Sequence, residues 1–124
     1  MKRTQSVEDY LETILMVREE KGSCRAIDIA QRLGFSKPSV SVALRNLEND
    51  GSVLRANDGS VHLTEKGQAV AASVLERHRF LTRFFTSLGV DPETAEKDAC
   101  GMEHALSEES FARFRAWFEN TQHS

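Results

Sequence analysis

The order of elements between residues 26 and 63 constrains the fold of this chain more than any other feature of its sequence. A helical segment over about 26–33 is expected to end at Gly34, and Ser36 can then cap a further helix whose first turn accommodates Pro38. Two helices joined by a tight turn that contains glycine predict a helix-turn-helix.

A β-hairpin is predicted directly after these two helices. The residues favour two short strands, 52–55 and 60–63, around a turn that contains Asp58 and Gly59. A helix-turn-helix followed at once by a hairpin is the order of a winged helix, and it is more specific than either element alone. The order favours DNA binding.

The helix after Ser36 has an apolar face and a face suited to a DNA groove. Its inward stripe consists of Val40, Ala43, Leu44 and Leu47. The other positions offer hydroxyls, a valine and basic groups, which can contact phosphates, thymine methyls and guanine edges. The candidate DNA-binding residues are Ser36, Lys37, Pro38, Ser39, Ser41, Val42 and Arg45. The alternative interpretation is a surface helix that is merely polar.

The charge distribution agrees with this interpretation although the total charge does not. The formal net charge is -3, and a net negative charge does not indicate phosphate binding. Between residues 23 and 47, however, four basic residues accompany the single acid Asp28. The basic residues are Arg25, Arg32, Lys37 and Arg45.

The remaining elements are expected to be helical, so the fold class is mainly α. Apolar periodicity and capping residues predict helices over about 6–21, 65–88, 92–106 and 108–119. We expect a winged helix-turn-helix DNA-binding domain over residues 1–66, followed by a helical dimerisation and metal-binding domain over residues 67–124.

Aromatic residues are concentrated in the last third of the chain. Six of the seven phenylalanines and the single tryptophan lie there, which exceeds the need of a small helical segment. We infer that part of this surface is buried against a second copy in a homodimer. The alternative is that these residues only cover the rest of the fold.

Composition excludes several classes of protein. Hydrophobic residues make up 40% and charged residues 28% of the chain, as in ordinary globular domains. No apolar run is long enough to span a bilayer, and no signal core follows the N-terminus, so we expect a cytoplasmic protein without membrane contact. The two cysteines, Cys24 and Cys100, provide no disulfide framework.

Two groups of side chains suggest metal chemistry. Asp9 and Glu12 are three residues apart and share a helix face, which alone would be a solvated acidic surface. A later helix is expected to carry Cys100, Glu103 and His104 on one edge, with Glu96 one turn earlier. Thiolate, carboxylate and imidazole together can form a first-row metal site. The alternative is a buried cysteine beside a surface Glu-His pair, and His78 alone would be an ordinary core histidine.

The sequence resembles the diphtheria-toxin-repressor and manganese-transport-regulator family of metal-dependent repressors over nearly its whole length. The motifs that carry the resemblance are SVEDYLETIL, DIAQRLGFSKPSVSVALRNLENDG, LTEKG, RHRFL and CGMEHALS. The resemblance implies a winged-helix dimer that binds palindromic operator DNA when metal is bound. It implies a metal site made of Asp9, Glu12, His78, Cys100, Glu103 and His104.

The match combines features of two branches of that family. Asp9 resembles the manganese branch, whereas Cys100 resembles the iron branch, and Thr82 and Glu96 replace the Glu and His of the second iron-type site. Because the sequence ends at Ser124, we expect a short form without the SH3-like domain of the long members. The expected cofactor is Fe²⁺ or Mn²⁺, and Co²⁺, Ni²⁺ or Zn²⁺ can substitute.

Two other functions compete with this interpretation. A winged-helix regulator could sense a thiol oxidant or small ligand through Cys100, although Asp98 and Glu103 nearby disfavour a thiolate. A small zinc hydrolase could use the same cluster, but no HExxH motif, nucleophile elbow or phosphate loop is present. We therefore do not expect an enzyme.

Overall fold

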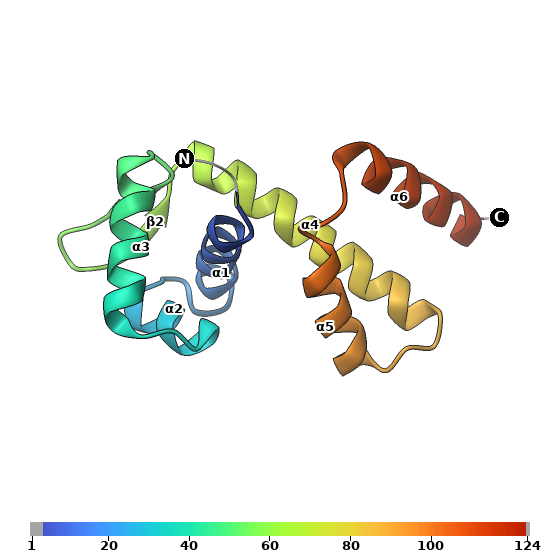
Figure 1. The fold of residues 1–124 in the computed structure, drawn as a ribbon, viewed down its shortest axis with the longest axis horizontal. Coiled ribbons are helices and arrows are strands. Elements are labelled where there is room, and N and C mark those ends of the chain that lie inside the picture. The colour runs from blue at the N-terminus through green and yellow to red at the C-terminus, as the bar shows by residue number, and fades with distance from the viewer. Residues whose placement is uncertain (1–3, 124) are drawn as a thin grey trace. The chain divides into compact units, whose positions relative to one another are not determined.

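The computed structural model describes residues 4–123 and confirms a mainly helical fold with one small sheet (Figure 1). The chain divides into two compact units, one ending at Ser73 and the other beginning at Val74. The boundary falls inside the helix α4 (Glu65–Ser87).

The first unit contains the expected helix-turn-helix. Its helices are α1 (Gln5–Lys21), α2 (Ala26–Leu33) and α3 (Lys37–Asn49). α2 ends at Gly34, whose φ of +72° is a left-handed conformation that glycine adopts without strain. The Ser36 hydroxyl accepts a hydrogen bond from the Ser39 amide at 3.3 Å and so caps α3. Local capping therefore places the turn where the sequence predicted it.

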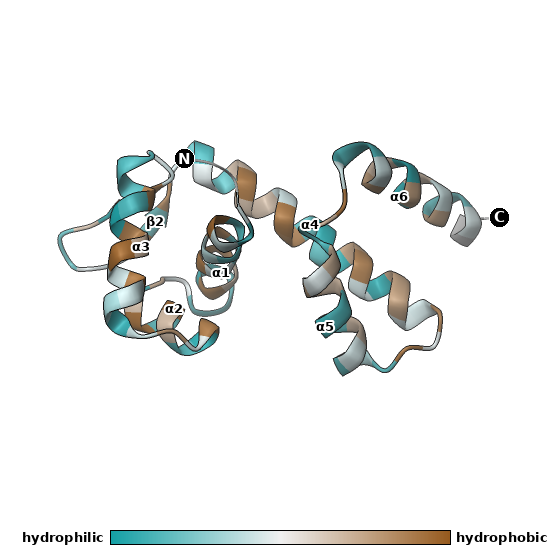
Figure 2. Ribbon diagram, in the orientation of Figure 1, coloured by the Kyte–Doolittle hydropathy of each residue, from teal (hydrophilic) through white to brown (hydrophobic). Residues whose placement is uncertain are grey.

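The apolar stripes of these helices form one core. Tyr10, Leu11 and Ile14 of α1 are buried together with Val40 and Leu44 of α3. Figure 2 shows hydrophobic and hydrophilic bands alternating along the helices, as expected for elements with one buried face. Burial of this stripe fixes which face of α3 remains in solvent.

The hairpin is also where the sequence predicted it. β1 (Val53–Arg55) pairs antiparallel with β2 (Val61–Leu63), with Val53 opposite Leu63 and Arg55 opposite Val61. The connector between α1 and α2 adds to this sheet, because the Val61 amide donates to the Cys24 carbonyl at 2.7 Å and Arg25 bridges to Ser60. The wing is therefore bound to the helical core on its inner side.

The residues of the LTEKG motif join the start of α4 to the turn between α3 and β1. Thr64 Oγ1 accepts from the Gly67 amide at 3.2 Å and donates to the Gly51 carbonyl at 2.6 Å. Lys66 Nζ donates to the Asp50 carbonyl at 2.9 Å. A Cβ on Gly67 would collide with the carbonyl of Ser52, so only glycine allows this close approach.

The second unit packs the rest of α4 with α5 (Pro92–Met102) and α6 (Glu108–His123). Phe80 is its centre: the ring lies edge-on to those of Phe111, Phe114 and Phe118, at centroid distances of 5.4, 5.8 and 5.5 Å. Several of the phenylalanines in the last third of the chain thus form the core of this unit. Trp117 and Leu88 remain 65% and 66% exposed, so large apolar groups also remain on its surface.

Two helix ends differ from the sequence prediction. α6 continues to His123 rather than 119, and α5 ends at Met102 rather than 106. Residues 103–107 form a turn, in which Ser107 caps α6 by accepting from the Ser110 amide at 3.0 Å. Among the described helices, none is long and apolar enough to cross a membrane.

Candidate DNA-binding face and metal centre

The candidate DNA-binding residues lie on the exposed side of α3 and its N-cap. The stripe residues Val40 and Leu44 are fully buried and Leu47 nearly so, whereas Val42 is 51% exposed. All seven candidates are exposed, namely Ser36, Lys37, Pro38, Ser39, Ser41, Val42 and Arg45. The helix thus presents hydroxyl, methyl and cationic groups to solvent without rearrangement of the core.

Wing residues were not among the sequence candidates. Leu54 and Arg55 of β1 are both exposed. The signal that could have identified Arg55 is its position in a short strand beside the Asp-Gly turn, since a basic group on a wing can reach a phosphate.

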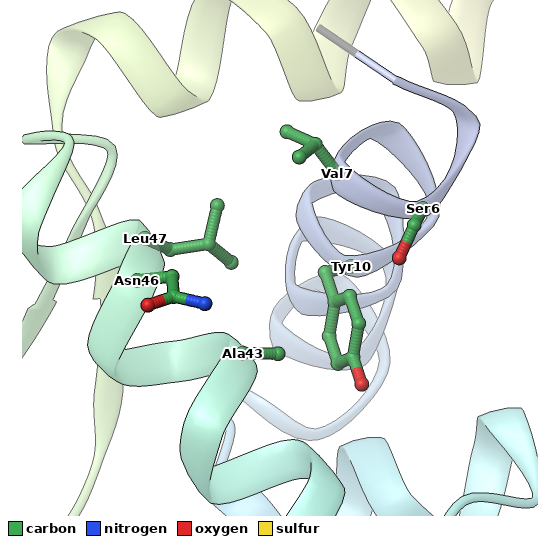
Figure 3. A pocket seen from close by; sticks show the side chains of 6 residues that line it. All are labelled: Ser6, Val7, Tyr10, Ala43, Asn46 and Leu47. Atoms are coloured by element: carbon green, nitrogen blue, oxygen red, sulfur yellow. The ribbon is translucent and has the colours of Figure 1, made fainter. Parts of the chain in front are cut away.

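A small pocket lies between α1 and α3 within the first unit. Figure 3 shows Val7 and Tyr10 of α1 and Ala43 and Leu47 of α3 around it. Its volume is about 100 Å³, and its other lining residues are the polar Ser6 and Asn46. The lining contains no charged side chain, so the pocket is not a metal site.

The two α1 candidates differ in their exposure. Asp9 is half-buried, and Glu12 is only 7% exposed. The interpretation of this pair as a solvated acidic surface is therefore wrong for Glu12. A buried carboxylate is costly unless it is paired, hydrogen-bonded or bound to a cation.

In the second unit, the carboxylate of Glu103 lies between two histidines. Its Oε2 is 2.8 Å from His78 Nδ1, and its Oε1 is 3.2 Å from His104 Nε2. The side chains of His78 and His104 are 14% and 6% exposed. α4 supplies His78. The sequence had predicted Glu103 and His104 within a helix over 92–106, but they lie in the turn after α5.

One oxygen of this carboxylate lacks a hydrogen bond. Glu103 is 1% exposed, and its Oε1 accepts none from the residues within 4–123. Buried acceptors are almost always satisfied, and an exception indicates an absent ion or water or a functional role. Carboxylate oxygen with two imidazoles is a donor set that Mn²⁺, Fe²⁺ and Zn²⁺ accept. The residues therefore fit a divalent transition metal.

Arg77 is a residue of this centre that the sequence reasoning missed. It is 9% exposed, and its guanidinium donates to the carbonyls of Glu103, at 3.2 Å, and Leu106, at 2.6 Å. The guanidinium also lies over the Phe111 ring, 4.9 Å from its centroid. Because Arg77 holds the carbonyl of Glu103, it fixes the turn that presents Glu103 and His104.

Glu96 and Cys100 are more exposed than these residues, whereas Cys24 is buried in the other unit. Glu96 Oε1 is 4.0 Å from His78 Nε2, and the Glu96 side chain is 67% exposed. Cys100 is exposed on α5. Cys24 is buried in the first unit, and burial raises the pKa of its thiol to about 11, so it is an unreactive core residue.

The two halves of the chain match two domain models of one family. The iron-dependent repressor N-terminal DNA-binding domain matches residues 2–61, and the iron-dependent repressor metal-binding and dimerisation domain matches residues 64–124. The chain belongs to the iron-dependent repressor family. Membership confirms the expectation of a metal-dependent, DNA-binding transcriptional regulator and excludes the hydrolase alternative.

Two similar transcriptional regulators support the same placement. This repressor is 40% identical over 113 residues to transcriptional regulator MntR of Escherichia coli O157:H7, covering 91% of this chain and 73% of the relative. It is 37% identical over 110 residues to HTH-type transcriptional regulator MntR of Bacillus subtilis strain 168, covering 89% and 78%.

The fold of this iron-dependent repressor is similar to that of two solved regulators. A manganese-dependent transcriptional repressor in complex with manganese has a TM-score of 0.80 and 31% identity, with 89% of this chain and 51% of that chain covered. IdeR of T. acidophilum has a TM-score of 0.79 and 27% identity, with 90% and 53% covered. The chain thus spans about half the length of these two solved proteins.

Proposed function

We propose that this protein is a homodimeric repressor that binds palindromic operator DNA when it holds Fe²⁺ or Mn²⁺, and that it controls metal-homeostasis genes. The proposed metal ligands are Asp9, Glu12, His78, Cys100, Glu103 and His104. The proposed DNA-binding residues are those of the exposed face of α3. One observation carries the proposal: the buried Glu103 carboxylate lies between His78 and His104 and has an oxygen without a hydrogen-bond donor among the described residues.

The side chains of the centre have separable roles in this proposal. If His78 Nδ1 donates its hydrogen to Glu103 Oε2, the other ring nitrogen keeps its lone pair for a ligand. Glu103 Oε1 and His104 Nε2 then offer further donor atoms. When bound, a divalent cation supplies the positive charge that offsets repulsion among the buried carboxylates.

The α1 carboxylates provide the connection to DNA. Asp9 and Glu12 lie on α1, which packs in one core with α2 and α3. A metal ion bound by these two carboxylates would therefore also constrain the position of α3. We propose that both units contribute ligands and that metal thereby fixes the two reading heads of a dimer about one DNA turn apart. Such coupling needs about 1–3 kcal/mol, or roughly a 5- to 150-fold change in DNA affinity.

We propose that DNA binding belongs to one domain, and dimerisation and metal binding to the other. We assign DNA binding to residues 1–66 and dimerisation and metal binding to residues 67–124. The exposed apolar groups of the second unit, Leu88 and Trp117, are the surface we assign to the partner subunit. A regulator of this kind acts on chromosomal DNA, and we place it in the cytoplasm.

The choice of metal depends on Cys100. Carboxylates and imidazoles suit Mn²⁺ and Fe²⁺ alike, whereas a thiolate favours Fe²⁺, Co²⁺, Ni²⁺ or Zn²⁺ over the harder Mn²⁺. The manganese complex among the solved relatives supports Mn²⁺, and Cys100 supports Fe²⁺. We therefore propose either ion as the co-repressor.

An anaerobic titration tests the function. Protein stripped with chelator is titrated with Mn²⁺, Fe²⁺, Co²⁺ and Zn²⁺ while its affinity for a pool of palindromic duplexes is measured at fixed salt. Metal-dependent, sequence-specific binding that His104→Ala abolishes without loss of folding supports the proposal. Equal binding in chelator and in every metal contradicts it.

The exposure of Cys100 favours one alternative, a regulator that senses a thiol oxidant. Peroxide added to chelator-treated protein separates the two functions, since only the oxidant sensor changes its DNA affinity without metal. Cys24 is the internal control in this experiment, because its high pKa protects it from the reagent.

A further inference from the structure

A chain of side-chain hydrogen bonds joins the last turn of α1 to the wing. Arg18 Nη1 is 2.6 Å from His62 Nδ1 and 3.4 Å from the carbonyl of Val61. On the other side of the ring, His62 Nε2 is 2.9 Å from Ser60 Oγ, which donates to Asp58 Oδ1 at 2.7 Å. All these residues belong to the first unit.

The hydrogen bonds from Arg18 to Asp58 allow only one consistent assignment of donors and acceptors. A guanidinium can only donate, so His62 Nδ1 accepts from Arg18 and the ring hydrogen resides on Nε2. Nε2 then donates to Ser60 Oγ, and the Ser60 hydroxyl hydrogen goes to the carboxylate of Asp58. The ring is thereby fixed in position and tautomer from both sides.

This hydrogen-bond network reaches the turn of the hairpin. Asp58 and Ser60 lie in and beside the turn of the hairpin, and the Ser60 amide also donates to Asp58 at 3.0 Å. Arg55, the last residue of β1, pairs in register with Val61, whose carbonyl accepts from Arg18. Arg55 is exposed and belongs to the same two-stranded sheet.

The same helix carries the proposed metal ligands Asp9 and Glu12 nearer its start. Arg18 follows Asp9 by nine residues, or about 14 Å of helix. A single α-helix over Gln5–Lys21 transmits a displacement of one end to the other as a rigid body. α1 is therefore in direct side-chain contact with the wing through Arg18.

We propose that Arg18 is a positioning residue which, through His62, holds the wing on α1 so that Arg55 contacts the DNA backbone in the metal-bound repressor. The inference rests on the proposed function, because it assigns to the wing a share of the metal response. Arg18 acts through His62 and has no contact with DNA of its own in this arrangement. Without the Arg18–His62 contact the hairpin keeps its backbone bonds to Cys24 and Arg25 but loses the side-chain support that fixes the orientation of Arg55 relative to α3.

The salt dependence of DNA binding tests this role. The probe is a duplex selected from a random pool by the metal-loaded wild type, and its affinity is measured between about 50 and 200 mM salt with saturating metal. Loss of one phosphate contact lowers the slope of log affinity against log salt by about 0.9. We expect Arg55→Met and Arg18→Met each to show this loss and a roughly fivefold or greater fall in affinity, and the double variant to show no further loss of slope.

Conservative variants distinguish positioning from general structural damage. Arg18→Lys retains a donor for His62 Nδ1, and His62→Asn retains the acceptor, so both should keep most of the wild-type slope. His62→Phe removes both hydrogen bonds and should behave as Arg18→Met does, which gives a second route if Arg18→Met does not fold. Arg115→Met is the matched control, because Arg115 pairs with Glu76 and Glu119 in the second unit.

The outcomes separate this inference from the proposed function. Wild-type slope and affinity in both Arg18→Met and His62→Phe would overturn the positioning role. A wild type that binds DNA equally in metal and in chelator would overturn the proposed function and with it the metal response of the wing. Unchanged metal affinity of DNA-free Arg18→Met, within about twofold, is expected in either case because Arg18 is not a ligand.

Discussion

Replacing Glu103 by glutamine should remove the stabilisation that metal gives this protein while leaving the metal-free fold nearly intact. Glutamine has the shape of glutamate, and its carbonyl oxygen can still accept from His78 Nδ1, which lies 2.8 Å from Oε2 in the structure. The variant loses the charge on the second oxygen, the atom that accepts no hydrogen bond within the described residues. We expect its metal-free stability to stay within about 1 kcal/mol of wild type.

The size of the lost effect follows from ligand linkage. A ligand at 100 times its dissociation constant stabilises the folded state by about 2.7 kcal/mol. Unfolding a chain of 124 residues has an entropy of roughly 0.26 kcal/mol/K, so saturating metal should raise the wild-type Tm by about 10 °C. In Glu103→Gln this shift should fall to a degree or two.

Differential scanning fluorimetry of chelator-stripped protein, with and without Mn²⁺ and at one protein concentration, measures both quantities. Glu109→Gln, at an exposed position in the first turn of α6, is the control for loss of one negative charge. A Tm shift in Glu103→Gln equal to that of wild type would refute the assignment of this carboxylate as a ligand. A large fall in metal-free Tm would refute the claim that glutamine satisfies the same contacts.

Four further substitutions test other parts of the structure. Arg45→Ala should weaken DNA binding by about 1–3 kcal/mol without changing metal affinity, as measured by fluorescence anisotropy and metal titration. Cys100→Ser should raise the ratio of Mn²⁺ to Zn²⁺ affinity in competition titrations, and an unchanged ratio would remove the thiol from the site. Arg77→Met should cost about 2–4 kcal/mol in urea unfolding, with Arg77→Lys recovering part of it, because two carbonyls lose a charged donor. Gly67→Ala should destabilise by more than about 1 kcal/mol through collision with Ser52, and a neutral effect would show that α4 can shift away.

The fold of the DNA-binding half could be predicted from sequence because its signals are local. The left-handed glycine after α2, the Ser36 cap and the Asp-Gly turn each act within a few residues, and the structure places all three where they were expected. The exposed side of α3 followed from its apolar stripe, since burial of one face leaves the other in solvent.

The end of α5 could not be predicted because its cause is distant in the sequence. The pattern of residues 92–106 is helical, but the helix ends at Met102, and Arg77 of α4 binds the carbonyls of Glu103 and Leu106 in the turn that follows. Arg77 itself looks like a surface residue of an amphipathic helix, and no local pattern shows that it is buried.

The candidate site was predictable in part. Three of the residues inferred from the sequence, His78, Glu103 and His104, lie together in the second unit, and their role as metal ligands stays a prediction. Glu12 was expected on a solvated face if taken alone, because helical periodicity reports only the position of apolar neighbours and not what covers a polar one. The membership of Cys100 in the site remains a prediction, since this residue is exposed on α5.

The connector between α1 and α2 has a consequence for how this protein avoids aggregation through the strands of its wing. Because Val61 donates to Cys24 and Ser60 bridges to Arg25, β2 has partners on both sides, and within residues 4–123 the open strand edge of this sheet is that of β1. That edge is three residues long and ends on the charged Arg55, which are two devices that suppress intermolecular strand pairing and fibril growth. The amide proton of Val61 should accordingly be among the slowest in the wing to exchange with deuterium.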